Sequence, residues 1–381
     1  MKRLLSFFLC AALLLALSAC GAAPGTPSTA PEPPSGTAPS QTGADTRTVT
    51  DRYGRQVEIP AQVNRVICVG SGTLRMLCYL QAQDLLAGVE DTDKGFETSV
   101  KRDYAYVNFD KLKDLPAVGK GGGTSYTAYP EEILTVNPDV ILCGYTQEAA
   151  EQLAQETVLP VVCTRFQSIN FIDESFYEAL TLMAEVLGRQ DRCREVLDFI
   201  DRCKQDLDQR TSGVPEAEKP TVYAGAVTFS GAHGFGGTYA NFGPFLAIHA
   251  RNVADETGEE GAFEVDLEKV LVWNPDYIFL DPGNLNLVQE EVAANPGFFQ
   301  SLAAVEAGKV YAMPSFNNYS TNATYALASA YYAGTVLYPS QFQDVDIAAK
   351  TDEILTFFLG RAYYGEMTDQ GLGFGPLTLG Q

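Results

Sequence analysis

The chain has 381 residues, of which 46% are hydrophobic, so it has enough apolar side chains for two domain-sized cores. It carries 26 basic against 48 acidic residues, a formal net charge of −22. Because nucleic-acid binding needs a basic face, this balance argues against a nucleic-acid partner and against a polybasic membrane-binding surface.

Residues 1–19 have the organisation of a secretion signal. Lys2 and Arg3 are followed by an apolar run that is too short to span a bilayer but suits a signal peptide. The run ends in Leu-Ser-Ala-Cys at Cys20, which resembles the bacterial lipobox. The resemblance implies that a lipid on Cys20 anchors the mature protein to the extracytoplasmic face of the cell membrane. The alternative is an ordinary cleaved signal followed by a chance cysteine.

Residues 20–46 are predicted to be the lipidated cysteine and a disordered tether. After Cys20, all of them except Glu32, Gln41 and Asp45 are Gly, Ala, Pro, Ser or Thr. Such a composition has too little apolar surface to offset the entropy lost on ordering.

Residues 47–188 are predicted to form an N-terminal α/β lobe that opens with a β-hairpin over Arg47–Pro60. Short apolar strands alternate with helical segments after it, the pattern of a parallel sheet covered on both faces. The predicted strands are Arg65–Val69, Leu85–Val89, Val140–Cys143 and Pro160–Cys163, and the predicted helices are Thr73–Leu80, Tyr129–Val136 and Glu148–Glu156.

Residues 189–211 are predicted to be a long connecting helix. The pattern from Asp173 to Gln209 is helical with a break at Gly188, and apolar residues then recur at intervals of three and four. This stripe fits a helix of about twenty residues, some 30 Å long.

Residues 212–340 are predicted to be a second α/β lobe, with strands at Thr221–Val227, Tyr277–Leu280 and Lys309–Met313. Pro130–Ile141 matches Leu267–Ile278 at a constant offset of 137, each copy being a helix stopped by Asn-Pro and followed by a buried strand. The predicted fold is therefore α/β, with two Rossmann-like lobes joined by one long α-helix. Residues 341–381 hold a further predicted helix and a tail without an assigned role.

This arrangement resembles the helical-backbone class of substrate-binding proteins of ABC importers. The resemblance is carried by Thr48–Arg55, by Pro60–Ile67 and by the duplicated motif. It implies a monomeric, non-enzymatic protein that passes a small metal chelate to an ABC permease and its ATPase. An iron-siderophore-like chelate is the expected ligand, and cobalamin or haem are the alternatives. Matched along the motif, Glu131 and Glu268 are the expected permease-docking residues.

Ligands of open α/β sheets lie beyond the carboxyl ends of the strands, so the segments that follow the predicted strands are the candidate site. Glycine-rich turns could approach a ligand closely, and an arginine could bind a carboxylate or catecholate. The residues predicted to face the ligand are Ser71, Thr73, Arg75, Tyr145, Arg165, Phe166, His233, Tyr239, Asn284, Asn317 and Tyr319. Tight turns, surface ion pairs and core packing are the alternative roles for these positions.

The sequence predicts no resident cofactor and no bare metal site. His233 and His249 are the only histidines, too few for the usual cage around a naked zinc or manganese ion. None of the six cysteines after Cys20 forms a C-x-x-C pair, and one disulfide among them is left open. A surface-anchored hydrolase is the competing class, but Ser71 and Ser230 lack the Gly-x-Ser-x-Gly context of a nucleophile.

Overall fold

The computed structural model describes residues 45–166 and 172–379. The predicted signal, Cys20 and the tether as far as residue 44 lie outside the described residues. The first element is the predicted hairpin, in which β1 (Thr46–Thr50) pairs antiparallel with β2 (Gln56–Pro60). Asp51 holds its turn by accepting hydrogen bonds from the backbone N–H groups of Tyr53 and Arg55.

The N-terminal lobe contains a five-stranded sheet in the order β5-β4-β3-β6-β7, with every pair parallel. Its central strands are buried along their whole length, because helices cover both faces. The strands are β3 (Val66–Val69), β4 (Leu86–Glu90), β5 (Ala117–Gly119), β6 (Val140–Cys143) and β7 (Val161–Cys163). The helices are α1 (Thr73–Tyr79), α2 (Asp103–Val107), α3 (Phe109–Leu112), α4 (Pro130–Val136) and α5 (Gln147–Thr157).

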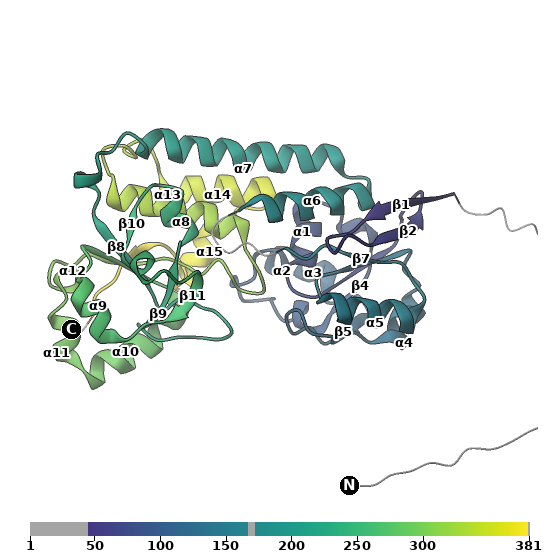
Figure 1. Cartoon of the computed structure of the whole chain (residues 1–381), viewed down its shortest axis with the longest axis horizontal. Helices are drawn as coiled ribbons and strands as arrows, with labels where there is room; N and C mark the ends of the chain where they lie inside the picture. Colours follow the sequence, from purple (N-terminus) through teal and green to yellow (C-terminus); the bar gives the residue numbers. More distant parts are fainter. Residues whose placement is uncertain (1–44, 167–171, 380–381) are drawn as a thin grey trace, which may run out of the picture. The chain divides into compact units, whose positions relative to one another are not determined.

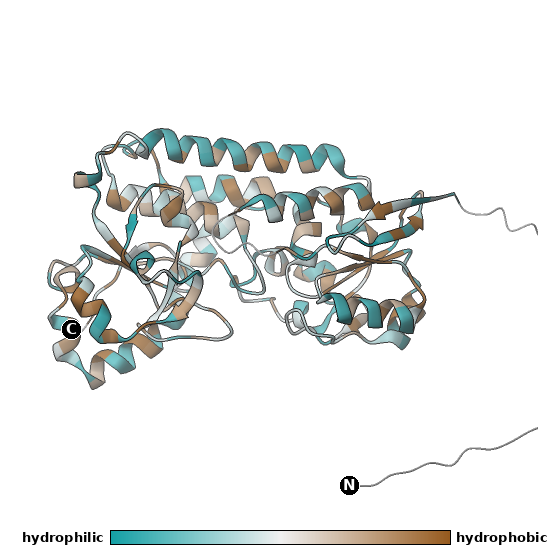
Figure 2. Cartoon of the chain, viewed as in Figure 1, coloured by the Kyte–Doolittle hydropathy of each residue, from teal (hydrophilic) through white to brown (hydrophobic). Residues whose placement is uncertain are grey.

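Two helices lead out of this lobe, α6 (Glu174–Leu187) and α7 (Gln190–Thr211). Gly188 separates them in a left-handed conformation with φ 65°, which explains the break predicted there. The buried side of α7 carries the predicted apolar stripe, while its other residues are mostly polar (Figures 1 and 2). At 22 residues α7 is about 33 Å long.

The C-terminal lobe contains a second five-stranded sheet in the order β10-β8-β12-β13-β14. Its strands are β8 (Thr221–Gly225), β10 (Arg251–Asn252), β12 (Tyr277–Leu280), β13 (Val310–Ala312) and β14 (Gly375–Pro376), and β14 alone is antiparallel to its neighbour. A separate pair joins β9 (Gly237–Ala240) to β11 (Gly261–Glu264). The helices are α8 (Gly243–Leu246), α9 (Leu267–Trp273), α10 (Leu285–Ala294), α11 (Pro296–Gln300), α12 (Ala303–Glu306) and α13 (Ala323–Leu337).

The C-terminal segment is part of the core and not a loose tail. Helix α14 (Ile347–Leu359) packs on α13 and on α1, and α15 (Tyr364–Asp369) follows it before β14 completes the sheet. The ring of Phe357 stacks on that of Phe199 at 4.0 Å, and Phe358 meets Tyr79 edge-on at 4.8 Å. The segment therefore joins the second sheet, α7 and the first helix of the N-terminal lobe.

The sequence repeat is also a structural repeat. Helices α4 and α9 are both seven residues long, and both end at an asparagine in the left-handed region, Asn137 at φ 46° and Asn274 at φ 42°. Asp139 and Asp276 follow at equivalent positions, and each carboxylate accepts a backbone N–H at the start of the neighbouring strand, from Arg65 before β3 and from Thr221 of β8. The prediction of an α/β fold with two similar parallel-sheet lobes is confirmed.

The six cysteines after Cys20 are all free and buried. Within residues 45–166 and 172–379, no helix is both long enough and apolar enough to cross a bilayer.

Candidate ligand-binding site

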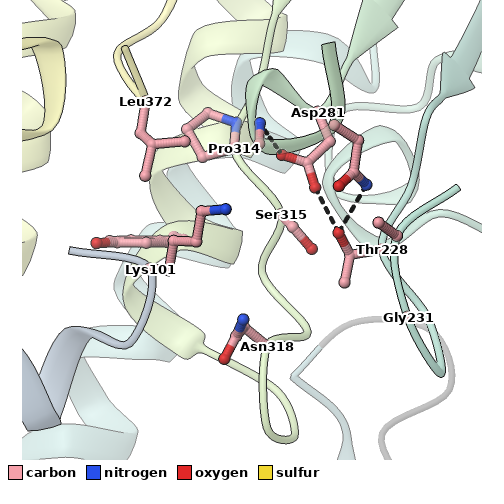
Figure 3. Close-up of a pocket in the computed structure, with 12 residues that line it drawn as sticks. Lys101, Thr228, Gly231, Asp281, Pro314, Ser315, Asn318 and Leu372 are labelled. Atoms are coloured by element: carbon pink, nitrogen blue, oxygen red, sulfur yellow. Dashed lines mark hydrogen bonds between the residues drawn. The ribbon is translucent and has the colours of Figure 1, made fainter. Parts of the chain in front are cut away.

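A cavity of about 280 Å³ lies at the carboxyl ends of three strands of the second sheet. Thr228 follows β8, Asp281 and Asn284 follow β12, and Ser315 follows β13, so the topology brings residues far apart in sequence to one edge. Lys101, from the loop before α2, contributes to the wall from the N-terminal lobe (Figure 3). The remaining lining residues are Gly231, Ala232, Gly283, Pro314, Asn318, Tyr325 and Leu372.

The floor of the cavity is a closed hydrogen-bond network around Asp281. Its carboxylate accepts the Thr228 hydroxyl at 2.8 Å and the Gly283 N–H at 2.9 Å. The Asn284 amide donates to the Thr228 hydroxyl oxygen at 2.9 Å and to the Ala226 carbonyl at 2.8 Å. Burial raises the pKa of Asp281 above its ordinary value. These groups satisfy one another, so we assign them to shaping the cavity.

Two other groups offer donors to a ligand. Among the described residues, the Lys101 ammonium takes part in no ion pair or hydrogen bond, and the side-chain amide of Asn318 has no hydrogen-bond partner either. Both line the cavity, and Lys101 lies across it from the turn that carries Gly231 (Figure 3). The Lys101 ammonium lies near enough to the buried Asp281 carboxylate to oppose the rise of its pKa, and together with the neutral Asn318 amide it can donate to a small anion.

Of the predicted ligand residues, Asn284 lines this cavity, and Asn317 lines a much smaller space that shares Asp281 and Ser315 with it. His233 does not line the cavity, although its neighbours Gly231 and Ala232 do. Its ring stacks on Phe229 and its two nitrogens contact Glu264 at 2.9 Å and the Phe229 carbonyl at 2.7 Å.

Tyr239 is in the core of the C-terminal lobe. Only 7% of it is exposed, its ring packs against Phe242 and Phe316, and burial raises its pKa to about 12. It does not line the cavity beside Lys101.

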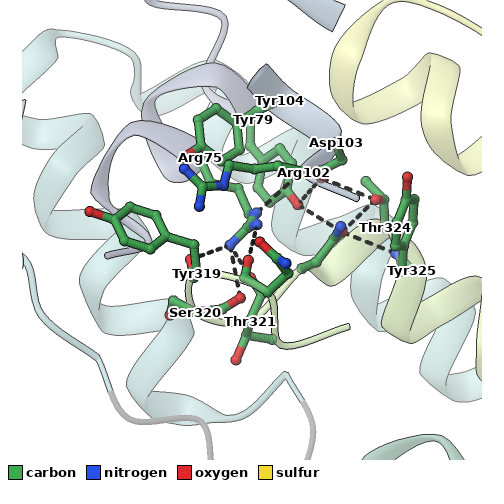
Figure 4. A network of polar contacts seen from close by, with 12 residues as sticks. Arg75, Tyr79, Arg102, Asp103, Tyr104, Tyr319, Ser320, Thr321, Thr324 and Tyr325 are labelled. Carbon is green, nitrogen blue, oxygen red and sulfur yellow. Dashed lines mark hydrogen bonds and ion pairs between the residues drawn. The ribbon is translucent and has the colours of Figure 1, made fainter. Parts of the chain in front are cut away.

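Arg75 and Thr73 are buried and engaged with protein groups instead of facing the cavity. Arg75 is 1% exposed and pairs with Asp103 at 2.9 Å. Its other nitrogens donate to carbonyl oxygens of the C-terminal lobe, at Tyr319, Ser320 and Thr321 (Figure 4) and at Asn318. The Thr73 hydroxyl donates to the Val69 carbonyl. Arg75 thus holds the two lobes together through the loop that leads from β13 to α13.

Tyr319 and Tyr145 meet at a buried carboxylate that the sequence analysis did not single out. Glu90, at the end of β4, accepts the Tyr319 hydroxyl at 2.7 Å, the Tyr145 hydroxyl at 3.3 Å and the Gly70 N–H at 3.1 Å. Burial is the main cause that raises the pKa of Glu90 to about 7. The structure therefore brings these two predicted residues together as a contact between the lobes.

The predicted anion-binding turn Gly70–Thr73 is also committed to protein contacts. Its first N–H donates to Glu90, and the Ser71 N–H donates to the Gly123 carbonyl at 2.9 Å. Gly72 has φ +83°, and a Cβ there would come within 2.9 Å of the Ser320 side chain and 3.1 Å of Phe166. Glycine is needed at this close approach of the lobes, and Phe166 packs behind it against Phe176.

Arg165 lines a different pocket, of about 180 Å³, together with Arg52, Tyr53 and Ser175. Its guanidinium donates to the Tyr53 hydroxyl at 3.3 Å, and Arg52 pairs with Glu178. Arg165 therefore does not share a cavity with Asn284.

Lys101, Thr228 and Ser315 line the cavity but were not predicted from the sequence. Lys101 lies outside every predicted strand end, and only the contact between the lobes brings it to the site. Among the described residues, no three His, Cys, Asp or Glu side chains are grouped so that they could hold a metal ion.

With this geometry in view, comparison with known proteins defines the class. The model of the periplasmic binding protein family matches residues 66–316, more than half of the chain. The chain belongs to this family, as one of its helical-backbone members, which are solute-binding proteins and not enzymes. The surface-anchored hydrolase is thereby set aside.

Comparison with individual proteins gives sequence identities below 25%. The molybdate-binding protein MolA of Haemophilus influenzae is 23% identical over 339 residues, covering 83% of this chain and 92% of MolA. The structure of MolA bound to molybdate aligns with a TM-score of 0.64 at 22% identity, covering 83% of this chain and 99% of that one. The TroA-like protein FepB from Veillonella parvula aligns with a TM-score of 0.62 at 21% identity, covering 87% and 99%. Helicobacter pylori CeuE with Ni(II) bound gives 0.62 at 17%, covering 85% and 99%.

Proposed function

We propose that this chain is the extracytoplasmic solute-binding component of an ABC importer, and that it captures a small anionic metal compound in the cavity beside Lys101. The observation that carries the proposal is the unpaired Lys101 ammonium at a cavity built from three strand ends. A compact ferric chelate and a metal oxyanion share this chemistry. The name of MolA supports the oxyanion. A structure from the Fe3+-hydroxamate transport system of Saccharomonospora viridis, which aligns with a TM-score of 0.53 at 19% identity, supports the chelate.

Cavity size separates these ligands from the larger alternatives. A volume of about 280 Å³ is just below the 300–1,000 Å³ typical of sites that enclose drug-sized molecules. It accommodates an oxyanion or the metal centre of a chelate whose organic part extends into solvent. Haem and cobalamin are too large to be enclosed there, so we favour the two small anionic ligands over them.

Delivery would use the two lobes together. Glu131 on α4 and Glu268 on α9 are exposed, occupy equivalent positions of the repeat, and make no ion pair with another described residue. We propose that they pair with cationic groups of the permease, and that a lipid on Cys20 keeps the protein at the membrane surface.

Isothermal titration of the purified protein with molybdate, a ferric catecholate chelate, haem and cobalamin tests the ligand class. Saturable binding of molybdate or the ferric chelate supports the proposal and decides between its two forms. Binding of haem or cobalamin alone, or of none of the four, would contradict it.

Charge reversal tests the docking residues. The double variant Glu131→Lys, Glu268→Lys should abolish uptake while it leaves ligand affinity within about twofold of wild type, because neither residue lines the cavity. Glu148→Lys, on the neighbouring helix α5, is a control for a change in surface charge. Uptake by the double variant at the wild-type rate would remove both residues from the docking site.

A further inference from the structure

Helices α4 and α9 expose a leucine one turn beyond each proposed docking carboxylate. Leu134 lies three residues after Glu131 and is 49% exposed, and Leu271 lies three residues after Glu268 and is 41% exposed. Residues three apart on a helix are neighbours on its surface. Each lobe therefore presents a carboxylate and an apolar side chain side by side.

The two leucines are equivalent by both sequence and structure. They are separated by the same 137 positions as the rest of the repeat. The residue before each of them, Ile133 in one copy and Val270 in the other, is fully buried and fixes the rotation of the helix. The exposure of the leucines is therefore a repeated property of the two lobes and not an irregularity at one site.

Exposed large apolar side chains are few elsewhere on the described surface. Five large apolar side chains are exposed on the described surface, and three of the five are on these two short helices. They are Leu134, Val158, Leu246, Leu271 and Val272. Apolar side chains gathered beside unpaired carboxylates are typical of an interaction surface, where the apolar contact excludes water from the charged pair.

We propose that Leu134 and Leu271 are contact residues for the permease, each inserting into an apolar site beside the cation that receives its glutamate. This inference rests on the proposed function, because it takes Glu131 and Glu268 as docking residues. The permease is the partner that fits, because the surface is duplicated, one copy per lobe, and is continuous with the docking carboxylates. Two matching copies would fix the orientation of the binding protein over its transporter.

The test compares leucine and glutamate variants in binding to the purified permease–ATPase complex. The full-length lipidated chain and the complex are both kept in detergent, so that the lipid anchor contributes no attachment to a bilayer. The variant Leu134→Gln, Leu271→Gln retains helix-forming side chains of similar length. It should weaken binding about tenfold per leucine, each tenfold being about 1.4 kcal/mol.

Leu246→Gln is the matched control, because Leu246 is 40% exposed but lies on α8, outside the repeat. It should change affinity less than twofold, and all variants should melt within a few degrees of wild type. Loss of binding in Glu131→Gln, Glu268→Gln with unchanged binding in the leucine variant would overturn this inference and leave the proposed docking intact. Unchanged binding in both would overturn both. A wild-type dimer in sedimentation that the leucine variant dissociates would show that the surface binds a second copy of the chain instead.

Discussion

At the scale of single residues, the guanidinium of Arg75 makes several contacts between the lobes. It satisfies the buried carboxylate of Asp103 and carbonyl oxygens of the loop that also carries Ser315 and Asn318 to the cavity. Asp103 accepts two further hydrogen bonds, from Tyr79 at 2.7 Å and from Thr324 at 3.1 Å. Removing the arginine would leave a buried charge and several carbonyl groups unpaired.

We therefore expect Arg75→Met to lower the free energy of unfolding by about 3–5 kcal/mol, the usual loss when one partner of a buried pair is removed. Denaturant unfolding measures it. Arg194→Met is the control, because the Arg194 side chain is 71% exposed in its pair with Asp191 and should contribute less than about 1 kcal/mol. Equal small losses in both variants would show that the Arg75 network does not stabilise the fold.

Glu90 predicts a pH dependence of stability. Its pKa is raised from 4.5 to about 7, so the folded protein keeps a proton that the unfolded chain has lost at the same pH. The stability due to this proton is fully present below about pH 4.5 and is lost as the pH rises through 7. Relative to Glu90→Gln, which keeps an acceptor for Tyr319, wild type should lose about 3 kcal/mol between pH 4.5 and 7.5. A difference that stays constant across this range would contradict the assignment.

At the scale of elements, two helices end in the same left-handed backbone conformation but with different residues. Helix α5 ends at Val158, a β-branched residue with φ 57° that is 88% exposed. Helix α6 ends at Gly188 with φ 65°, in space open enough for a side chain. The same left-handed termination is thus made once with a favourable residue and once with a strained one.

Val158→Gly should therefore stabilise the protein by about 1 kcal/mol, because it removes this strain and gives up almost no buried surface. Gly188→Ala is the opposite change and should destabilise by about the same amount. Thermal melting of the two variants measures both. A lower melting temperature for Val158→Gly would mean that its side chain makes a contact more favourable than the strain.

How far the sequence predicts these elements depends on the range of the interactions that form them. The elements that the sequence predicts follow from local patterns, and most of their ends fall within two residues of the prediction. The sequence did not predict β5, β9, β10 and β11, or the helices α2, α3, α8 and α10 to α13. Strand β14 is two residues long and exists only because Gly375 pairs with Ala312, far away in sequence. The cavity has the same origin, since Lys101 reaches it from the other lobe. A local pattern carries no signal for such contacts.

Arg75 is another residue whose contacts depend on the opposite lobe. It was predicted to face the ligand, but its donors are used by Asp103 and by the loop of the C-terminal lobe. The sequence could not show that the loop of the opposite lobe presents carbonyl oxygens to Arg75. These oxygens accept the hydrogen bonds that Arg75 would otherwise donate to a ligand.

At the scale of the whole molecule, the proposed function combines the two lobes with a lipid anchor on Cys20. We expect Cys20 to be the first residue of the mature protein and to carry a diacylglycerol. Mass spectrometry of the N-terminal peptide from native membranes tests this. An unmodified Cys20, or a mature chain that begins elsewhere, would contradict the lipid anchor and leave the binding site unaffected.

The central claim is that a small anionic metal compound binds in the cavity beside Lys101. Its most direct test is the dissociation constant of Lys101→Ala, measured by calorimetry with the ligand that binds wild type. Loss of a charge-assisted hydrogen bond of about 1.5–3 kcal/mol predicts a ten- to hundredfold weaker affinity. The melting temperature should not change, because the Lys101 side chain is exposed and unpaired among the described residues. Lys120→Ala, an exposed lysine outside the cavity, should bind as wild type does. Wild-type affinity in Lys101→Ala would contradict the claim.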